Sequence, residues 1–169
     1  MSSFPRVVDD VSVRLIAGVV LLVTVLAIAF GAWWLYLPLL LDFVLRSAIG
    51  PRASPVAQLV NRVVRPRLST PKRPTAGPPK RFAAAIGAVM SAAIVVLWLA
   101  GAPSPLLLVL GAVMVVFPAL ESIFGVCVGC LAFGGLMRLG IIPEEVCLEC
   151  ADISLRQRRL AAERSPSRG

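Results

Sequence analysis

The sequence predicts an all-α fold: an integral membrane bundle of four transmembrane helices, followed by a short cytoplasmic helical segment at the C-terminus. Two observations carry this prediction. The 169 residues are 58% hydrophobic and only 15% charged, with a mean hydropathy of +0.88, whereas a soluble domain of this size needs far more polar surface. The apolar residues also gather in runs long enough to cross a hydrocarbon core of about 30 Å.

The first hairpin is predicted at residues 14–49, after a polar lead-in at 1–13. One helix over residues 15–49 would extend about 52 Å, which exceeds the membrane core. We therefore expect two short helices, at about residues 14–30 and 33–49, joined by a turn near Gly31. Trp33 and Trp34 follow that turn and suit the membrane interface. A cleaved signal peptide would need a polar stretch after its cleavage site, and another apolar run follows instead.

The segment 50–81 is a basic, proline-rich loop. It carries eight Lys and Arg residues, no acid and seven prolines. A short helix at 55–64 is expected to lie on the membrane surface. The positive-inside rule places the loop in the cytoplasm. The loop has no aromatic residue on which a base could stack, so we expect no nucleic-acid partner.

The second hairpin is predicted at residues 82–126, with spans at 82–100 and from Leu106 toward Gly125 and an uncharged turn at 101–105 between them. A segment with two Cys-x-x-Cys pairs follows at 127–153, and a charged, partly disordered tail at 154–169. Four spans with a cytoplasmic basic loop put both termini in the cytoplasm, with the bilayer of the bacterial inner membrane as the first partner.

Two charges fall inside the second span. Asp42 and Arg46 lie four residues apart and share a helical face. Three interpretations remain open: an ion pair that fixes helix packing, a proton or ion relay, or an arginine that reaches the cytoplasmic surface beside a protonated acid. The relay would fit a small transporter or assembly factor. Because four spans are few for a pore, transport would require a homo-oligomer or a partner.

All four cysteines form Cys-x-x-Cys pairs, Cys127/Cys130 and Cys147/Cys150, separated by sixteen residues. The spacing suits thiol–disulfide chemistry, with Cys127 and Cys130 as the active pair and Glu121 as a proton partner. It equally suits a structural zinc site formed by all four sulfurs. The chain has no histidine, which excludes histidine-ligated haem and histidine bases.

The reactivity of the first pair depends on the local backbone. If a new helix begins near Cys127, its N-terminal dipole favours the thiolate, whereas a fourth span that simply continues disfavours it. Gly125 and Gly129 permit a break there. Glu121 is also expected to be hydrated or to pair with Arg46. The second cysteine pair lies among acidic residues, which oppose thiolate formation.

Four sequence stretches together resemble the bacterial DUF4395 membrane proteins. They are GPRASPVAQLVNRVVRPRL at 50–68, PKRF at 79–82, FGVCVGC at 124–130 and GIIPEEVCLECADI at 140–153. The resemblance implies a family of unknown function without assigned catalytic residues. It also implies companions among thioredoxin-like and sulfurtransferase proteins, which favours thiol or sulfur chemistry.

Overall fold

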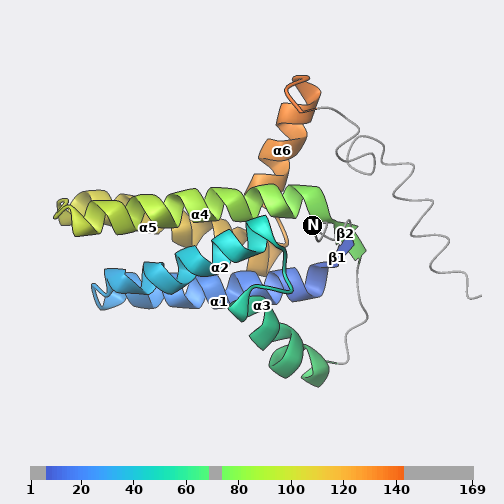
Figure 1. The fold of residues 1–169 in the computed structure, drawn as a ribbon, viewed down its shortest axis with the longest axis horizontal. Helices are drawn as coiled ribbons and strands as arrows, with labels where there is room; N and C mark the ends of the chain where they lie inside the picture. The colour runs from blue at the N-terminus through green and yellow to red at the C-terminus, as the bar shows by residue number, and fades with distance from the viewer. Residues whose placement is uncertain (1–6, 69–73, 143–169) are drawn as a thin grey trace, which may run out of the picture.

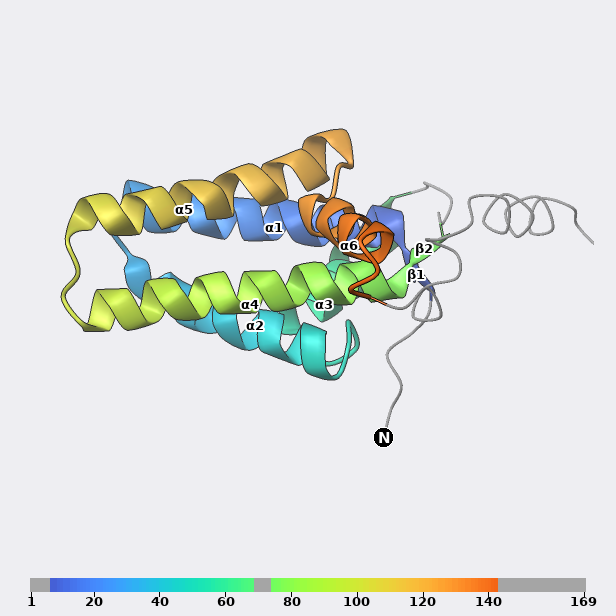
Figure 2. The same cartoon turned by 90° about the horizontal axis from the view of Figure 1, so that it is seen from above.

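Apolar sequence determines the main elements of the computed structural model, which describes residues 7–68 and 74–142. Four helices run side by side as a bundle (Figures 1 and 2). The bundle helices are α1 (Asp10–Ala29), α2 (Tyr36–Ala48), α4 (Gly77–Leu99) and α5 (Ser104–Ala119). Helix α2 packs mainly against α4, and α1 packs mainly against α5. The helical class predicted from composition is therefore confirmed.

The helices at the far end of the bundle are joined by tight turns. Gly31 and Gly101 both have a left-handed backbone, with φ of +63° and +71°, which residues with a side chain rarely adopt. A short 3-10 turn, η1 (Trp33–Leu35), leads into α2. The turn predicted near Gly31 and the turn predicted at 101–105 are both present, so the chain folds into two hairpins.

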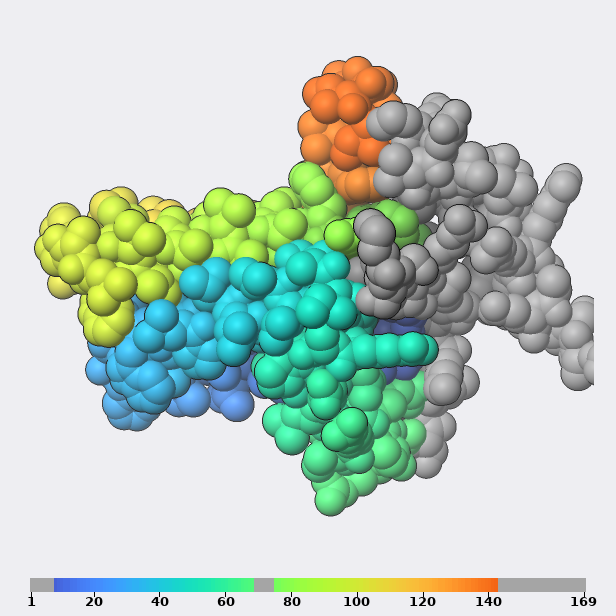
Figure 3. Space-filling view, viewed as in Figure 1, coloured from blue at the N-terminus to red at the C-terminus, as the bar shows by residue number. Residues whose placement is uncertain are grey.

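The opposite end of the bundle carries the shorter elements. Helix α3 (Pro55–Leu59) continues through a π-helical turn η2 (Val60–Val64) and a 3-10 turn η3 (Arg65–Arg67). Helix α5 continues through a π-helical turn η4 (Leu120–Phe124), after which α6 (Val128–Arg138) begins. Helices α3 and α6 leave the bundle in opposite directions (Figure 1). The space-filling view shows them as two protrusions at the same end (Figure 3).

A two-stranded ribbon closes this end. Strand β1 (Val7–Asp9) pairs antiparallel with β2 (Pro74–Ala76), with Val7 opposite Ala76. The sequence pattern does not predict the ribbon, because its strands are far apart in sequence and only three residues long. The ribbon fixes the start of α1 beside the start of α4.

The core lies between the four bundle helices. Its buried residues include Val20 of α1, Tyr36 of α2, Ile94 of α4 and Met114 of α5. The outer surface is also apolar: Leu22, Val89 and Val109 are 59%, 68% and 62% exposed. Large apolar surface on all sides of a bundle is unfavourable in water and matches a bilayer environment.

The structure supports three of the four predicted spans by their length, and the second span is short. Three helical segments of the described chain are long and apolar enough to cross a membrane: Asp10–Ala29, Gly77–Leu99 and Ser104–Phe124. Helix α2 has 13 residues, or about 20 Å at 1.5 Å per residue, and falls short of the length predicted for residues 33–49. Its first turn is lost to η1 and its last residues form the corner before α3.

Other boundaries also differ from the predictions. Helix α1 begins at Asp10, four residues earlier than predicted, with Asp10 and Arg14 paired across one turn at 3.8 Å. Helix α4 begins at Gly77, five residues earlier than predicted, because prolines are tolerated in the first turn of a helix. The predicted C-terminal helical segment, Cys147 and Cys150 lie outside the described residues.

Candidate functional site

The first cysteine pair lies at a helix start. The chain leaves η4 through Gly125, whose φ of +72° ends the preceding helix, as in a left-handed C-terminal cap. A side chain at Gly125 would also collide with Arg14, whose Nη2 lies 1.8 Å from the ideal Cβ position. The alternative in which the fourth span continues through the cysteines is therefore wrong, and a new helix begins at Val128.

Cys127 caps this new helix. Its Sγ accepts a hydrogen bond from the backbone N–H of Cys130 at 3.3 Å, and Cys127 is the N-cap residue of α6. A helix N-terminus carries a partial positive charge and unpaired N–H groups. A thiolate is favoured at this position, as a carboxylate would be.

The environment lowers the pKa of the Cys127 thiol, mainly because the Cys130 thiol donates a hydrogen bond to it. The positive charge of Lys80 and the Cys130 backbone N–H act in the same direction, while burial and the charge of Glu121 oppose it. The same hydrogen bond and burial raise the pKa of Cys130. Cys127 is buried and Cys130 is partly exposed, so the pair consists of a shielded thiol with a lowered pKa and a more accessible thiol with a raised pKa.

Glu121 pairs with a lysine that sequence analysis did not single out. The Nζ of Lys80 lies 2.5 Å from Oε1 of Glu121, and both side chains are largely buried. The expected alternative, a pair between Glu121 and Arg46, is not what the structure has. The signal for Lys80 was its position just before the third apolar run. It was counted with the basic loop, because the loop was expected to continue to residue 81.

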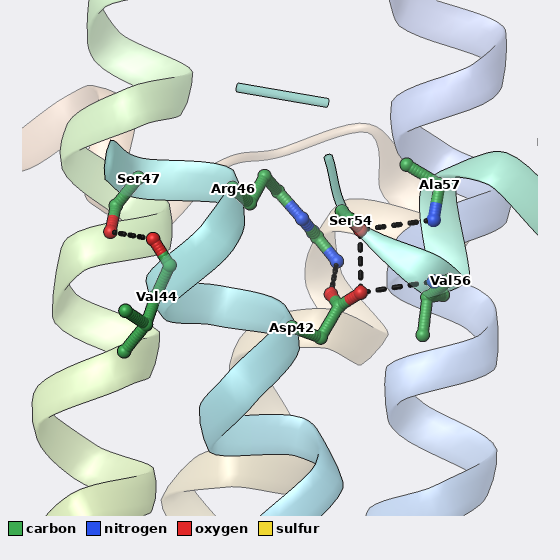
Figure 4. A network of polar contacts seen from close by, with 7 residues as sticks. All are labelled: Asp42, Val44, Arg46, Ser47, Ser54, Val56 and Ala57. Atoms are coloured by element: carbon green, nitrogen blue, oxygen red, sulfur yellow. Dashed lines mark hydrogen bonds and ion pairs between the residues drawn. The ribbon is translucent and has the colours of Figure 1, made fainter. Parts of the chain in front are cut away.

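Asp42 and Arg46 form an ion pair through Oδ2 and Nη2. The other carboxylate oxygen, Oδ1, accepts a hydrogen bond from Ser54 Oγ at 2.5 Å and one from Val56 N–H at 3.0 Å. Ser54 Oγ in turn accepts the N–H of Ala57 at 3.0 Å and caps α3. Figure 4 shows these contacts around one carboxylate. Asp42 therefore joins α2 to the start of α3.

Arg46 has a second environment. Its guanidinium carbon lies 5.2 Å from the ring centre of Phe43. Its Nε is buried and has no hydrogen-bond partner among the described residues. Arg46 also lines two cavities, so one edge of its guanidinium is saturated by Asp42 while its Nε keeps an unused donor.

Two adjoining cavities lie at this end of the bundle. The first, of about 240 Å³, is lined partly by polar residues that include Ser12, Asn61 and Lys80. The second, of about 290 Å³, is lined mostly by apolar residues and by Cys127. Arg46 and Glu121 line both cavities. The structure thus brings together Cys127, Cys130, Glu121 and Lys80, and Arg46 lines the same cavity as Cys127.

The zinc hypothesis stays a prediction. Two of its four ligands, Cys147 and Cys150, lie outside residues 7–68 and 74–142. Within those ranges, no group of three or more His, Cys, Asp or Glu side chains is placed to hold a metal ion. Cys127 and Cys130 alone supply two sulfur ligands.

Comparison with known proteins gives a family and no further relative. The family described as "Domain of unknown function (DUF4395)" matches residues 8–138, which include every element described above from α1 to α6. No curated protein and no solved structure matches the chain significantly. Since the match covers more than half of the sequence, this chain belongs to the DUF4395 family.

Proposed function

We propose that this protein is a membrane thiol–disulfide exchange protein whose active pair is Cys127 and Cys130. The observation that carries the proposal is the hydrogen bond from the Cys130 N–H to Cys127 Sγ at the start of α6. Thiolates at helix N-termini and in Cys-x-x-Cys motifs are the reactive species of exchange chemistry. Lys80 adds a nearby positive charge that lowers the pKa of Cys127.

The geometry also favours one direction of exchange. A pair whose reduced form is stabilised has a more oxidising disulfide. Cys127 as a thiolate gains hydrogen bonds from the Cys130 thiol and N–H and the charge of Lys80, and together these outweigh burial and the charge of Glu121. The disulfide form lacks that anion and gains little from these groups. The pair therefore oxidises a partner dithiol more readily than it reduces a partner disulfide.

The exposure of the two sulfurs indicates which one is attacked. Cys130 is partly exposed and Cys127 is buried, and exchange is faster when the leaving thiol has a low pKa. A partner thiolate attacks Cys130 Sγ, the Cys127–Cys130 bond breaks, and Cys127 leaves as the stabilised thiolate. A second partner thiolate then attacks the partner's own sulfur and releases Cys130, which takes a proton. Two electrons pass from the partner to the pair.

The topology that accompanies this function has four crossings, with α2 and η1 as the short second crossing. The basic loop, both termini and the cysteine pair face the cytoplasm, and the partner is a thioredoxin-like dithiol or a sulfurtransferase thiol. Lys80 and Arg81 lie at the start of α4, and Lys80 and Cys127 line adjoining cavities. This arrangement supports the orientation, because basic segments are retained in the cytoplasm. A reporter fused after Gly169 should be active only in the cytoplasm.

Trapping the thiols in cells tests the redox proposal. Cells are quenched with acid, free thiols are labelled with a bulky maleimide, and the shift on a gel counts them. A Cys147→Ser/Cys150→Ser variant confines the measurement to the first pair. We expect part of this variant to carry a Cys127–Cys130 disulfide that disappears with reductant. Thiols that stay reduced under every growth condition would contradict the proposal, as would stoichiometric zinc bound by all four sulfurs.

A single-cysteine comparison tests the order of attack. On the same background, Cys127→Ser leaves the accessible Cys130, and Cys130→Ser leaves the buried Cys127. Cys127→Ser should accumulate mixed disulfides with partner proteins, and Cys130→Ser should not. The opposite pattern would reverse the assignment of the attacked sulfur.

A further inference from the structure

The cavity beside Cys127 lies where two bundle helices separate. Helices α4 and α5 are joined at the far end and diverge toward the cysteine pair, with α6 beside the gap between them (Figure 2). Between the side chains of these helices lies a cavity of about 290 Å³. Pro118, within α5, removes one backbone hydrogen bond near this point, and the π-helical turn η4 follows.

The walls of this cavity are chemically divided. Most of the lining is apolar and includes Met90, Met114 and Phe117. The flexible methionine side chains and the flat phenylalanine ring can pack against the ring of a ligand. The polar lining groups include Arg46, Glu121 and Cys127. A ligand that fits must therefore be an apolar, ring-sized group with at least one hydrogen-bond acceptor.

Two further observations indicate which chemical groups the ligand carries and from which side it enters. The buried Nε of Arg46 has no partner among the described residues, so a carbonyl oxygen of a ligand would receive its hydrogen bond. Phe117 lines the cavity and is 38% exposed on a helix that belongs to a candidate membrane span. One wall of the cavity thus also faces the bilayer, and a lipid-soluble ligand can enter from there.

We propose that this cavity binds the ring of a quinone, which takes electrons from the Cys127–Cys130 dithiol. The proposal rests on the thiol–disulfide function above, and it supplies the oxidant that a pair of this kind needs after each exchange. A volume of about 290 Å³ is near the lower end of ordinary ligand pockets, which suits a single ring and excludes a two-chain lipid.

The electrons and protons balance. The Cys127 thiolate gives its electron pair toward the quinone ring, a bond forms between the Sγ atoms of Cys127 and Cys130, and the Cys130 thiol loses its proton. The quinone gains two electrons and two protons and becomes a quinol. One of these protons comes from Cys130 and the other from water in the adjoining polar cavity, which shares Glu121 with the quinone site.

The test uses the full chain with Cys147→Ser/Cys150→Ser, reduced, in quinone-free lipid nanodiscs without oxygen. A fully ring-substituted benzoquinone with a short isoprenoid chain is added, because its ring has no free position at which a thiol would form a stable adduct. We expect one quinol and one Cys127–Cys130 disulfide for each chain, read from absorbance and from maleimide labelling.

The matched variants are Ala132→Phe and Leu131→Phe, at neighbouring exposed positions of α6. Ala132 lines the cavity and Leu131 is not among its lining residues. Ala132→Phe should slow quinol formation about tenfold or more, as expected for loss of ring binding worth at least one decade of affinity. Leu131→Phe should leave the rate within about twofold, as expected for a surface substitution that touches no ligand.

The outcomes separate this proposal from the one on which it rests. If the pair exchanges with a model dithiol but never passes electrons to the quinone, the quinone site is refuted and the exchange function stands. Equal slowing by both variants, with exchange intact, would also refute the quinone site. If the pair exchanges with nothing, the exchange function itself fails.

Discussion

Two polar corners lie at the same end of the bundle, and they use their buried charges differently. At the α2–α3 corner, both oxygens of Asp42 have partners: Arg46, Ser54 and Val56. At the α5–α6 corner, the Cys127 sulfur accepts hydrogen bonds from Cys130 and lies near the positive charge of Lys80. Cys127 also lines a cavity. A buried carboxylate whose two oxygens both have hydrogen-bond partners holds elements together. A polar side chain that borders a cavity has room for a reacting group.

This comparison favours the structural interpretation of Asp42 and Arg46 over the relay. A relay needs a carboxylate that can exchange its hydrogen bonds, and the Asp42 carboxylate is 2% exposed and holds the start of α3. Arg46 belongs to both corners, because it pairs with Asp42 and lines the cavity next to Cys127. The two corners are therefore physically connected through one guanidinium.

The largest effect is expected from Asp42→Ala. The change leaves Arg46, Ser54 Oγ and Val56 N–H without their shared acceptor, and breaking a buried ion pair from one side costs about 3–5 kcal/mol. Denaturant or detergent unfolding in micelles measures the loss.

Ser47→Ala is the matched control, since Ser47 Oγ donates only to the Val44 carbonyl at an exposed site of the same helix. Its cost should stay within about 0.5 kcal/mol. Equal costs for the two variants would remove the distinction between a saturated structural corner and an ordinary surface.

The next effect is expected at Gly129, which carries α6 close to α4. A Cβ at this position would lie 2.6 Å from the Ala83 Cβ and 2.7 Å from its Cα, so Gly129→Ala must displace the helix. Overpacking of this kind costs about 1–3 kcal/mol. Alkylation of Cys127 should also become faster as α6 moves away.

Gly134, on the same helix, provides the control. A Cβ there meets nothing within 4 Å, and replacing a helical glycine with alanine gains up to about 1 kcal/mol. Gly134→Ala should therefore stabilise the protein slightly and leave the alkylation of Cys127 unchanged. Faster alkylation in both variants would show that the corner responds to α6 in general and not to the Ala83 contact.

A smaller effect is expected from Ser54→Ala. Ser54 is fully buried, caps α3 and donates to Asp42, and loss of a serine cap typically costs about 1 kcal/mol. Unfolding measurements should place Ser54→Ala between Ser47→Ala and Asp42→Ala. A cost above that of Asp42→Ala would make the cap, and not the ion pair, the main support of the corner.

The smallest expected effects are two opposite shifts in the pKa of Cys127. The charge of Lys80 lowers the pKa of Cys127 and the charge of Glu121 raises it. On the Cys147→Ser/Cys150→Ser background, the pH midpoint of Cys127 alkylation should rise in Lys80→Gln and fall in Glu121→Gln. Wild-type Cys127 should react below the pH range of an ordinary thiol. Shifts in the same direction for both variants would mean that lost packing, not charge, controls the thiol.

The thiol contributes to stability with a definite sign. Because folding lowers the pKa of Cys127, this group stabilises the fold most above the pH at which an unfolded thiol ionises. The contribution is lost as pH falls through the folded pKa. The raised pKa of Cys130 acts in the opposite sense at high pH.

The sequence by itself determined the local features of this protein. Apolar runs specified helices, Gly31 and the residues after Leu99 specified turns, and the four-residue spacing put Asp42 beside Arg46 on one face. Gly125 marked a place where a helix could end, whereas the reactivity of the cysteine pair stays a prediction. Each of these depends on neighbours within about one or two helical turns, where sequence constrains geometry strongly.

Only the tertiary structure decided which distant groups meet. The Lys80–Glu121 pair joins residues 41 apart, the ribbon joins Val7 to Ala76, and Ser54 reaches Asp42 across 12 positions. The cavity beside Cys127 likewise depends on how α4, α5 and α6 pack. The short α2 results from the η1 turn before it and the corner after it. Periodicity and composition carry no information on such contacts, because they depend on helix crossings and side-chain volumes that are fixed only when the whole bundle has formed.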